Sequence, residues 1–514
     1  MNKRMKLLMI PAVALTLSSC GGETGSGVTL NMWTGFGQSM TTQLESILET
    51  YSSEKGVNVV HTGQGGYDNL LANIVGSVST STYPNLAVAY PDHMAQYQES
   101  GILFNLDNYI KEDSLDLSKY YENYLTECQE IVEGSTMGLP FNKSTEVLTT
   151  NQTFVNRLID WTKDKTGDDK ITGVPTTWQE VEKFGKAALK ILDEKGAWNK
   201  VVGTDGKIYK DSVEAGTVGK VDVEIDLSAV DKASFRVLSY DSQANFFITA
   251  VRQWGGTYTS VEKLPNGKMQ GYMEYKSDAT IEMFNFFFNL FEEQIIGIPS
   301  DFNESSYTST PFKAFKTIFT IGSSAGVSNC VPAGEGATLF DITINPIPYN
   351  ADKPDCKYVI SQGTNLVMFK NTDATSRRET WNLLKDLSYN PQTNADFARA
   401  TGYIPVTKDA YNSETYQNYL KDETLTGTQK TMRDAILTNF DDYLGDGSTW
   451  IQFVDPGFVG SSSIRANVGN IMTMVRDTTP AQLGNTEESA KNYWESQIDI
   501  YYNQNPNNIR PESK

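Results

Sequence analysis

The chain has 514 residues, with 43 Lys and Arg against 63 Asp and Glu, so its formal net charge is −20 at pH 7. An acidic surface of this kind repels nucleic acid and anionic lipid headgroups, and we expect neither as a partner. The only histidines are His61 and His93, which argues against most hydrolases and metalloenzymes because histidine is the usual base and metal ligand near neutral pH.

The N-terminus has the pattern of a secretion signal followed by a lipid-attachment site. Three basic residues precede an apolar run over 7–17, which is too short to serve as a stop-transfer helix. The Leu-Ser-Ser-Cys segment ending at Cys20 resembles the bacterial lipobox, whose cysteine is diacylated and begins the mature protein. We therefore expect a signal peptide over 1–19, a lipidated cysteine and flexible tether over 20–27, and an extracytoplasmic body anchored to the cell membrane through Cys20 alone.

Alternating strands and helices are predicted directly after the tether. Strand-like runs occur at 28–33, 57–61 and 86–90. Apolar residues at helical spacing separate them, in one helix ended by Gly56 and in a second broken by Pro84. This order predicts a parallel sheet with helices on both faces, and such sheets place ligands at the carboxyl ends of their strands.

Helices are predicted for much of the remaining chain. Thr177 begins one helix with a capping box, and a cluster of phenylalanines marks 278–294 as a buried helix. Residues 376–402 predict two helices separated near Pro391. The polar, glycine-rich stretch at about 201–234 predicts a β-hairpin insertion, because it lacks the apolar residues of a domain core.

Motifs for catalysis or metal binding are incomplete. Residues 322–326 match the G-x-S-x-G nucleophile elbow, but no histidine follows them in the chain to act as the base. The three cysteines after the lipobox, Cys128, Cys330 and Cys356, have no metal-like spacing. A Cys330–Cys356 disulfide and buried free thiols both stay open. We expect no enzymatic activity, no metal and no other cofactor.

Two segments resemble signature stretches of a known family. Gly-Leu-Pro-Phe-Asn-Lys-Ser-Thr-Glu-Val-Leu at 138–148 and Thr-Gly-Tyr-Ile-Pro-Val-Thr-Lys at 401–408 are similar to segments of the family 1 extracellular solute-binding proteins of ABC importers. That family holds the maltose and glycerol-3-phosphate binders. Residues 67–90 align with the glycerol-phosphate binders without a gap, and the resemblance covers nearly all of the mature chain.

The resemblance implies an α/β fold of the periplasmic-binding-protein type, with two lobes, hinge crossovers and a ligand cleft between the lobes. Lobe 1 would comprise 28–145 plus 346–404, and lobe 2 would comprise 146–345 plus 405–514. The crossovers would lie at 141–146, at 345–349 and beside 402–406.

The resemblance also implies a ligand site. Positions that keep the chemistry of the glycerol-phosphate binders are two tyrosines, a serine, a glycine whose NH faces the ligand and a phosphate-pairing arginine, namely Tyr67, Tyr403, Ser144, Gly363 and Arg465. Tyrosines suit sugars and polyols because they join an apolar face to a hydrogen-bonding tip. Arg465 begins an apolar helical stretch, so we expect it near a helix N-terminus, which favours an anion.

Other positions depart from that pattern. Pro91 stands where the binders carry an acid, so the adjacent Asp92 is the expected binding residue. Ser242 and Asn245 stand where the second lobe carries two tryptophans, and Ser242 is retained as a site residue. This loss of stacking surface leaves a carbohydrate, a polyol phosphate and another small polar solute open.

The leading interpretation is a monomeric, non-enzymatic receptor for a small polar solute. It would bind a carbohydrate or a polyol phosphate such as glycerol-3-phosphate and deliver it to the permease of an ABC transporter. A secreted carbohydrate-active enzyme is one alternative, but acids are plentiful and nothing singles out a catalytic pair. A structural or adhesive lipoprotein is the other alternative, and it would require no ligand.

Overall fold

The computed structural model of the protein describes residues 27–195, 198, 201–202, 208–209, 232–264, 269–332, 340–370 and 373–511. The predicted signal peptide, Cys20 and most of the tether lie outside these residues, as does most of the predicted insertion at 201–234. Within that insertion, β5 (Val201–Val202) and β6 (Ile208–Tyr209) pair antiparallel. No helix within the described ranges has the length and apolar character needed to cross a membrane.

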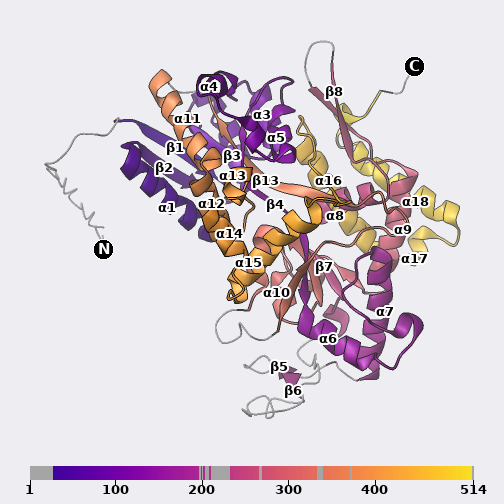
Figure 1. Cartoon of the computed structure of the whole chain (residues 1–514). Coiled ribbons are helices and arrows are strands. Elements are labelled where there is room, and N and C mark those ends of the chain that lie inside the picture. Colours follow the sequence, from indigo (N-terminus) through magenta and orange to yellow (C-terminus); the bar gives the residue numbers. More distant parts are fainter. Residues whose placement is uncertain are drawn as a thin grey trace, which may run out of the picture.

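One hydrogen-bonded sheet of ten strands runs through the molecule (Figure 1). Its main path is β10-β7-β11-β4-β13-β3-β1-β2, while β12 also pairs with β4 and β14 with β13. The strands are β1 (Thr29–Thr34), β2 (Asn58–Gly63), β3 (Leu86–Ala89), β4 (Leu139–Asn151), β7 (Leu238–Tyr240), β10 (Ile296–Gly297), β11 (Phe319–Ser323), β12 (Ile342–Asn345), β13 (Tyr358–Met368) and β14 (Ile451–Phe453). A separate hairpin is formed by β8 (Thr259–Lys263) and β9 (Met269–Met273).

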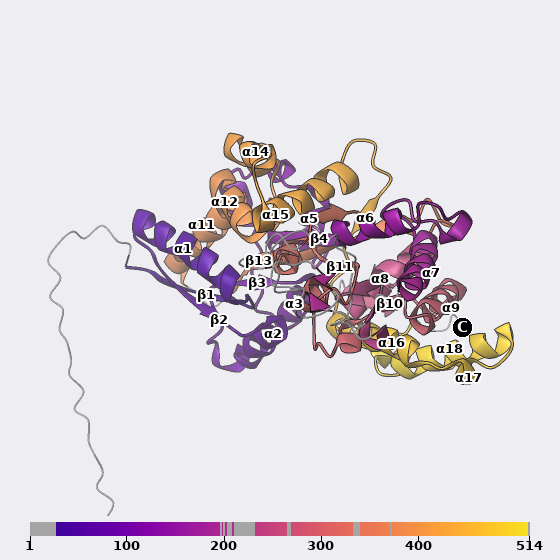
Figure 2. The ribbon, with the colours of Figure 1, turned by 90° about the horizontal axis from the view of Figure 1, so that it is seen from below.

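Helices cover both ends of this sheet, and Figure 2 shows α1, α11 and α12 near β1 and β2 on one side and α7, α9 and α18 on the other. The first group comprises α1 (Gln38–Lys55), α2 (Tyr67–Gly76), α3 (Pro91–Glu99), α4 (Asp107–Glu112), α5 (Glu122–Gln129), α11 (Ala374–Tyr389), α12 (Pro391–Thr401), α13 (Lys408–Tyr411) and α14 (Glu414–Leu420). The second comprises α6 (Gln152–Trp161), α7 (Trp178–Glu194), α8 (Gln243–Gln253), α9 (Asp278–Glu292), α10 (Ser309–Lys313), α16 (Ser461–Asp477), α17 (Pro480–Leu483) and α18 (Glu487–Tyr502). Between them lies α15 (Gly427–Leu437).

The local predictions for the first strands and helices are confirmed. β1 pairs parallel with both β2 and β3, and α1 and α2 connect the three strands. The capping box of α7 is present: the Thr177 hydroxyl accepts from the Glu180 NH, and the Glu180 carboxylate accepts from the Thr177 NH. α11 and α12 are separate helices, with Pro391 in the first turn of α12.

Two hydrophobic cores define the two lobes. The core of lobe 1 holds side chains of β1, β3, α1 and α11, and the core of lobe 2 holds side chains of β7, β11, α8 and α9. β4 joins them, since Phe141 packs in the first core and Val147 in the second. β13 makes the return passage, since Ile360 packs in the second core and Leu366 in the first.

The other passages between the lobes lie later in the chain than the sequence suggested. Ile347 packs in the core of lobe 2, so the chain has not left that lobe at 345–349. Pairing with β14 keeps the first half of β13 in lobe 2 as well. Ile404 and Val406 pack in lobe 1. The third passage of the chain between the lobes therefore lies within α15 and the helical turn after it. Residues 346–360 therefore belong to lobe 2, and 405–420 to lobe 1.

Candidate functional site

All the residues predicted to contact ligand line one cavity of about 1360 Å³ between the lobes. Tyr67, Asp92 and Tyr403 come from lobe 1, whereas Ser242 and Arg465 come from lobe 2. The crossover strands β4 and β13 supply the remaining two, Ser144 and Gly363.

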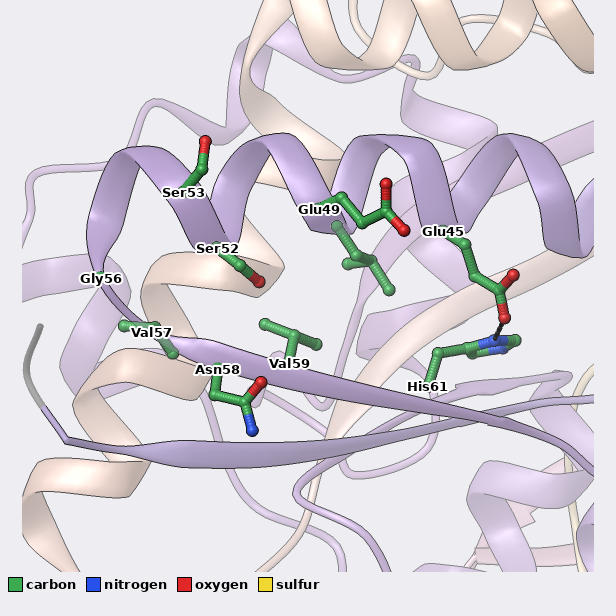
Figure 3. A pocket seen from close by; sticks show the side chains of 10 residues that line it. Glu45, Glu49, Ser52, Ser53, Gly56, Val57, Asn58, Val59 and His61 are labelled. Atoms are coloured by element: carbon green, nitrogen blue, oxygen red, sulfur yellow. Dashed lines mark hydrogen bonds and ion pairs between the residues drawn. The ribbon is translucent and has the colours of Figure 1, made fainter. Parts of the chain in front are cut away.

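A smaller hollow of about 640 Å³ lies on lobe 1 between α1 and β2. Figure 3 shows Glu45 and Glu49 on the helix facing the strand, with Glu45 bonded to His61. The Nε2 atom of His61 lies 2.8 Å from the Thr34 hydroxyl of β1, so this histidine ties the helix to the sheet. The hollow contains none of the predicted ligand residues, and the interlobe cavity is therefore the candidate site.

Tyr67 reaches the cavity because two loops of lobe 1 approach closely. It is the first residue of α2, directly after Gly66, whose φ of 124° favours glycine. A Cβ on Gly35, in the loop after β1, would lie 2.8 Å from the Tyr67 nitrogen. Both glycines thus allow the loops after β1 and β2 to bring Tyr67 to the carboxyl ends of the parallel strands.

Three tyrosines of lobe 1 form one wall. The rings of Tyr67 and Tyr90 pack edge to face with centroids 4.8 Å apart. Tyr403 lines the cavity beside them. Burial raises the pKa of Tyr67, Tyr90 and Tyr403, so all three are neutral phenols near neutral pH that both donate and accept hydrogen bonds.

The floor of the cavity is the contact between the two crossover strands. Gly363 has a φ of +97°, and a Cβ there would lie 1.9 Å from the Asn142 carbonyl oxygen. Lys143 Nζ, fully buried, donates to the Gly363 carbonyl at 3.4 Å and pairs with the buried Glu127. Burial lowers the pKa of Lys143 well below its ordinary value. Ser144 Oγ donates to the Gln362 side-chain oxygen at 3.5 Å. The close approach of β13 to the Asn142 carbonyl requires glycine at position 363, because a Cβ there would clash with it.

Asp92 already uses both carboxylate oxygens within the protein. Oδ1 accepts from the His93 NH at 3.0 Å, and Oδ2 accepts from the Ser462 hydroxyl at 2.6 Å. Gln96 donates to the same hydroxyl at 3.2 Å. Because Asp92 and Gln96 are on α3 and Ser462 is on α16, these bonds join lobe 1 to lobe 2 at one end of the cavity.

Arg465 lies in the second turn of α16, with a partly exposed side chain. Its guanidinium donates to the Asn245 side-chain oxygen and lies 3.9 Å from Asp455 Oδ2. Asp455 also accepts from Arg252 at 2.7 Å. Ser242 caps α8, since its hydroxyl accepts from the Asn245 NH at 3.3 Å. Asp455 is therefore shared by two guanidinium groups, with Arg252 the nearer of the two.

Sequence reasoning missed Glu146, which also lines the cavity. Its side chain is buried and accepts from the Tyr240 hydroxyl at 2.5 Å. Burial raises the pKa of Glu146 to about 7, although Tyr240, Asn245 and the charge of Arg465 act in the opposite direction. Alternation along β4 places Ser144 and Glu146 on the same face, and this spacing was the signal that could have identified it.

The cavity wall is acidic. The described lining residues include six carboxylates, those of Asp68, Asp92, Glu127, Glu146, Asp241 and Asp455. Arg465 is the only Lys or Arg among the described lining residues. Tyr258 and Tyr307 of lobe 2 also line the cavity and were not identified from the sequence. The site therefore offers many hydrogen-bond acceptors and aromatic faces but little positive charge.

The described residues give little support for a metal site, a disulfide or a nucleophilic serine. No group of three or more His, Cys, Asp or Glu side chains in the described ranges could hold a metal ion. Cys330 and Cys356 are free thiols, so the disulfide left open by the sequence is not formed. Ser324, at the nucleophile position of the G-x-S-x-G match, is buried and accepts from the Thr145 NH at 3.2 Å.

Comparisons with known proteins agree with this architecture. The family described as bacterial extracellular solute-binding protein matches residues 46–424, whereas no curated protein sequence matches the chain. Similar solved structures include UgpB from Mycobacterium tuberculosis in complex with glycerophosphocholine, with a TM-score of 0.61, 14% identity and coverage of 93% of this chain and 100% of that one.

Two further structures share the fold. The maltose/maltodextrin-binding domain MalE from Bdellovibrio bacteriovorus, bound to maltotriose, has a TM-score of 0.60, 16% identity and coverage of 93% of this chain and 100% of its own. An ABC substrate-binding protein from Listeria monocytogenes in complex with cycloalternan has a TM-score of 0.61, 13% identity and coverage of 94% and 100%. The predicted two-lobe α/β fold is confirmed, and the chain belongs to the bacterial extracellular solute-binding proteins, which serve ABC importers and are not enzymes.

Proposed function

We propose that the protein captures a neutral saccharide outside the cytoplasmic membrane and delivers it to the permease of an ABC transporter. The observation that carries the proposal is the lining of the interlobe cavity, which combines tyrosines from both lobes with six carboxylates and one arginine. Saccharide hydroxyls donate to carboxylates and tyrosine oxygens, and sugar rings present apolar faces to aromatic side chains.

The same lining disfavours a polyol phosphate. A phosphate group would bring about two negative charges near neutral pH to a wall lined by six carboxylates. Arg465, the only Lys or Arg among the described lining residues, already contacts Asn245 and Asp455. Of the solutes considered from the sequence, a carbohydrate is therefore favoured over glycerol-3-phosphate.

We infer further that the mature protein is held at the membrane by lipid on Cys20. The support is the basic, apolar and cysteine pattern of the N-terminus. Cys20→Ser should release the protein into the medium or leave an uncleaved precursor, as measured by fractionation and mass spectrometry of the mature N-terminus. A processed variant that stays firmly membrane-bound would contradict this anchor.

The proposed solute class is tested with matched ligand pairs. Glucose and glucose 6-phosphate, and glycerol and glycerol-3-phosphate, differ mainly in charge and should be compared by thermal shift and titration calorimetry with maltotriose, cycloalternan and glycerophosphocholine. A neutral saccharide should stabilise the protein and be recovered unchanged by chromatography. Preference for the phosphate member of a pair would contradict the saccharide proposal, turnover would favour the enzyme alternative, and binding of none would favour an adhesive lipoprotein.

A further inference from the structure

Tyr307 is unusual among the aromatic side chains of this protein. It is 72% exposed, and it is the only aromatic residue among the exposed large hydrophobic side chains of the described chain. It also lines the interlobe cavity. An exposed aromatic ring at the wall of a binding cavity has a free face that a ligand can cover, and burying such a ring is a large source of binding energy.

The backbone that carries Tyr307 is firmly held. The residue lies in the loop between the short helix Pro299–Phe302 and α10. The next residue, Thr308, is fully buried, and its NH and hydroxyl both donate to Asp241 Oδ1, at 2.6 and 2.5 Å. The Thr308 hydroxyl also lies 2.6 Å from that of Thr320 in β11. The neighbouring Thr308 therefore anchors the backbone of the loop, so that less backbone freedom is lost when a ligand binds.

Tyr307, Tyr90 and Tyr403 line the same interlobe cavity. The pKa values of Tyr90 and Tyr403 are raised, mainly by burial, and Tyr307 contributes in the same direction. Tyr90 and Tyr403 belong to lobe 1, whereas the loop of Tyr307 is attached to β7 and β11 of lobe 2. Aromatic side chains thus stand on both sides of the same space.

We propose that Tyr307 is the stacking platform of lobe 2, on which one ring of a cyclic saccharide lies while the tyrosines of lobe 1 contact it from the other side. This inference rests on the proposed function and narrows it, because it requires a ligand with a sugar ring and excludes an acyclic polyol. Tyr307 also gives lobe 2 an aromatic face toward the cavity, where the lining positions Ser242 and Asn245 are not aromatic and Phe246 and Phe247 of α8 are buried in the core.

The experiment compares the wild type with Tyr307→Ala, Tyr307→Phe and a control, Ile500→Ala, which removes an exposed apolar side chain of α18 outside the cavity. The probes are maltotriose and cycloalternan, measured by titration calorimetry. Tyr307→Ala should weaken binding about 10-fold or more, while Tyr307→Phe stays within about threefold of wild type because stacking needs the ring and not the hydroxyl. Ile500→Ala should bind as wild type does.

A second readout reports the stacking itself. In NMR spectra of the bound saccharide, ring-current shifts move the C–H protons over an aromatic face upfield, and these shifts should persist in Tyr307→Phe and decrease in Tyr307→Ala. Equal affinity of wild type and Tyr307→Ala, or equal loss in the Ala and Phe variants, would overturn the platform while the receptor function stands. Failure of the wild type to bind either probe would instead overturn both this inference and the saccharide proposal.

Discussion

Replacing Glu146 by glutamine should remove a pH dependence of stability that the native fold imposes. The native pKa of Glu146 is raised from 4.5 to about 7, with burial as the main cause. A raised carboxyl pKa means that the native state binds this proton more tightly than the unfolded chain does. The resulting stabilisation is fully present below about pH 4.5 and is lost as the pH rises through about 7.

The magnitude follows from the size of the shift. One pKa unit corresponds to about 1.4 kcal/mol, so the contribution that disappears between acidic and alkaline pH is on the order of 3 kcal/mol. Glutamine keeps the shape and the hydrogen-bonding capacity but does not titrate. The difference in the free energy of unfolding between Glu146→Gln and the wild type should therefore change by about 3 kcal/mol in favour of the variant from pH 4.5 to pH 8.5. Ligand-free protein should show this change most directly.

The assay is urea unfolding, followed by circular dichroism at half-unit steps from pH 4.5 to 8.5. Tyr240→Phe provides a second test, because it removes the hydroxyl that donates to the Glu146 carboxylate and should move the midpoint of the pH dependence upward. Glu49→Gln removes an exposed carboxylate of α1 and controls for net charge. Parallel stability curves for wild type and Glu146→Gln across this range would refute the reasoning.

Three further outcomes are expected. Arg465→Ala should weaken the binding of a neutral saccharide by about 1 kcal/mol, which corresponds to one hydrogen bond. A loss of about 2–4 kcal/mol in binding free energy, measured by calorimetry, would instead indicate an anionic ligand. Ser462→Ala removes the donor to Asp92 that joins α3 of lobe 1 to α16 of lobe 2. It should weaken this contact by about 1.5–3 kcal/mol and let the two lobes move apart; an unchanged radius of gyration in small-angle scattering without ligand would contradict this. Gly363→Ala places a Cβ against the Asn142 carbonyl and should lower the free energy of unfolding, measured by urea titration, by roughly 2–4 kcal/mol. A urea midpoint equal to that of the wild type would contradict this expectation.

Local chemistry along the chain predicted much of the architecture. The period of the apolar residues located β1, α1, β2, α2 and β3, and Thr177 located the start of α7, because helix periodicity and capping depend on neighbouring residues. The resemblance named ligand positions that the fold brings to one cavity, although they lie as far apart in the chain as Tyr67 and Arg465. Their contacts with a solute stay a prediction.

What the sequence could not provide depends on the arrangement of distant segments. The lobe to which the first half of β13 belongs is decided by its pairing with β14, far along the chain, so the apolar pattern of β13 alone does not reveal the passage. The exposure of Tyr307 and the burial of Glu146 are likewise set by the packing of the second lobe. A tyrosine and a glutamate look the same in sequence whether they face water, a core or a cavity.

The insertion of β13 between β3 and β4 also constrains the order of folding. Asn142 and Thr364 hydrogen-bond across β4 and β13 although they are 222 positions apart. Until β13 has been synthesised, the sheet of lobe 1 has no link to β4, and contacts this distant in sequence form slowly because a long loop must first close. The late strand therefore delays the completion of lobe 1 until the chain is available at least as far as Met368.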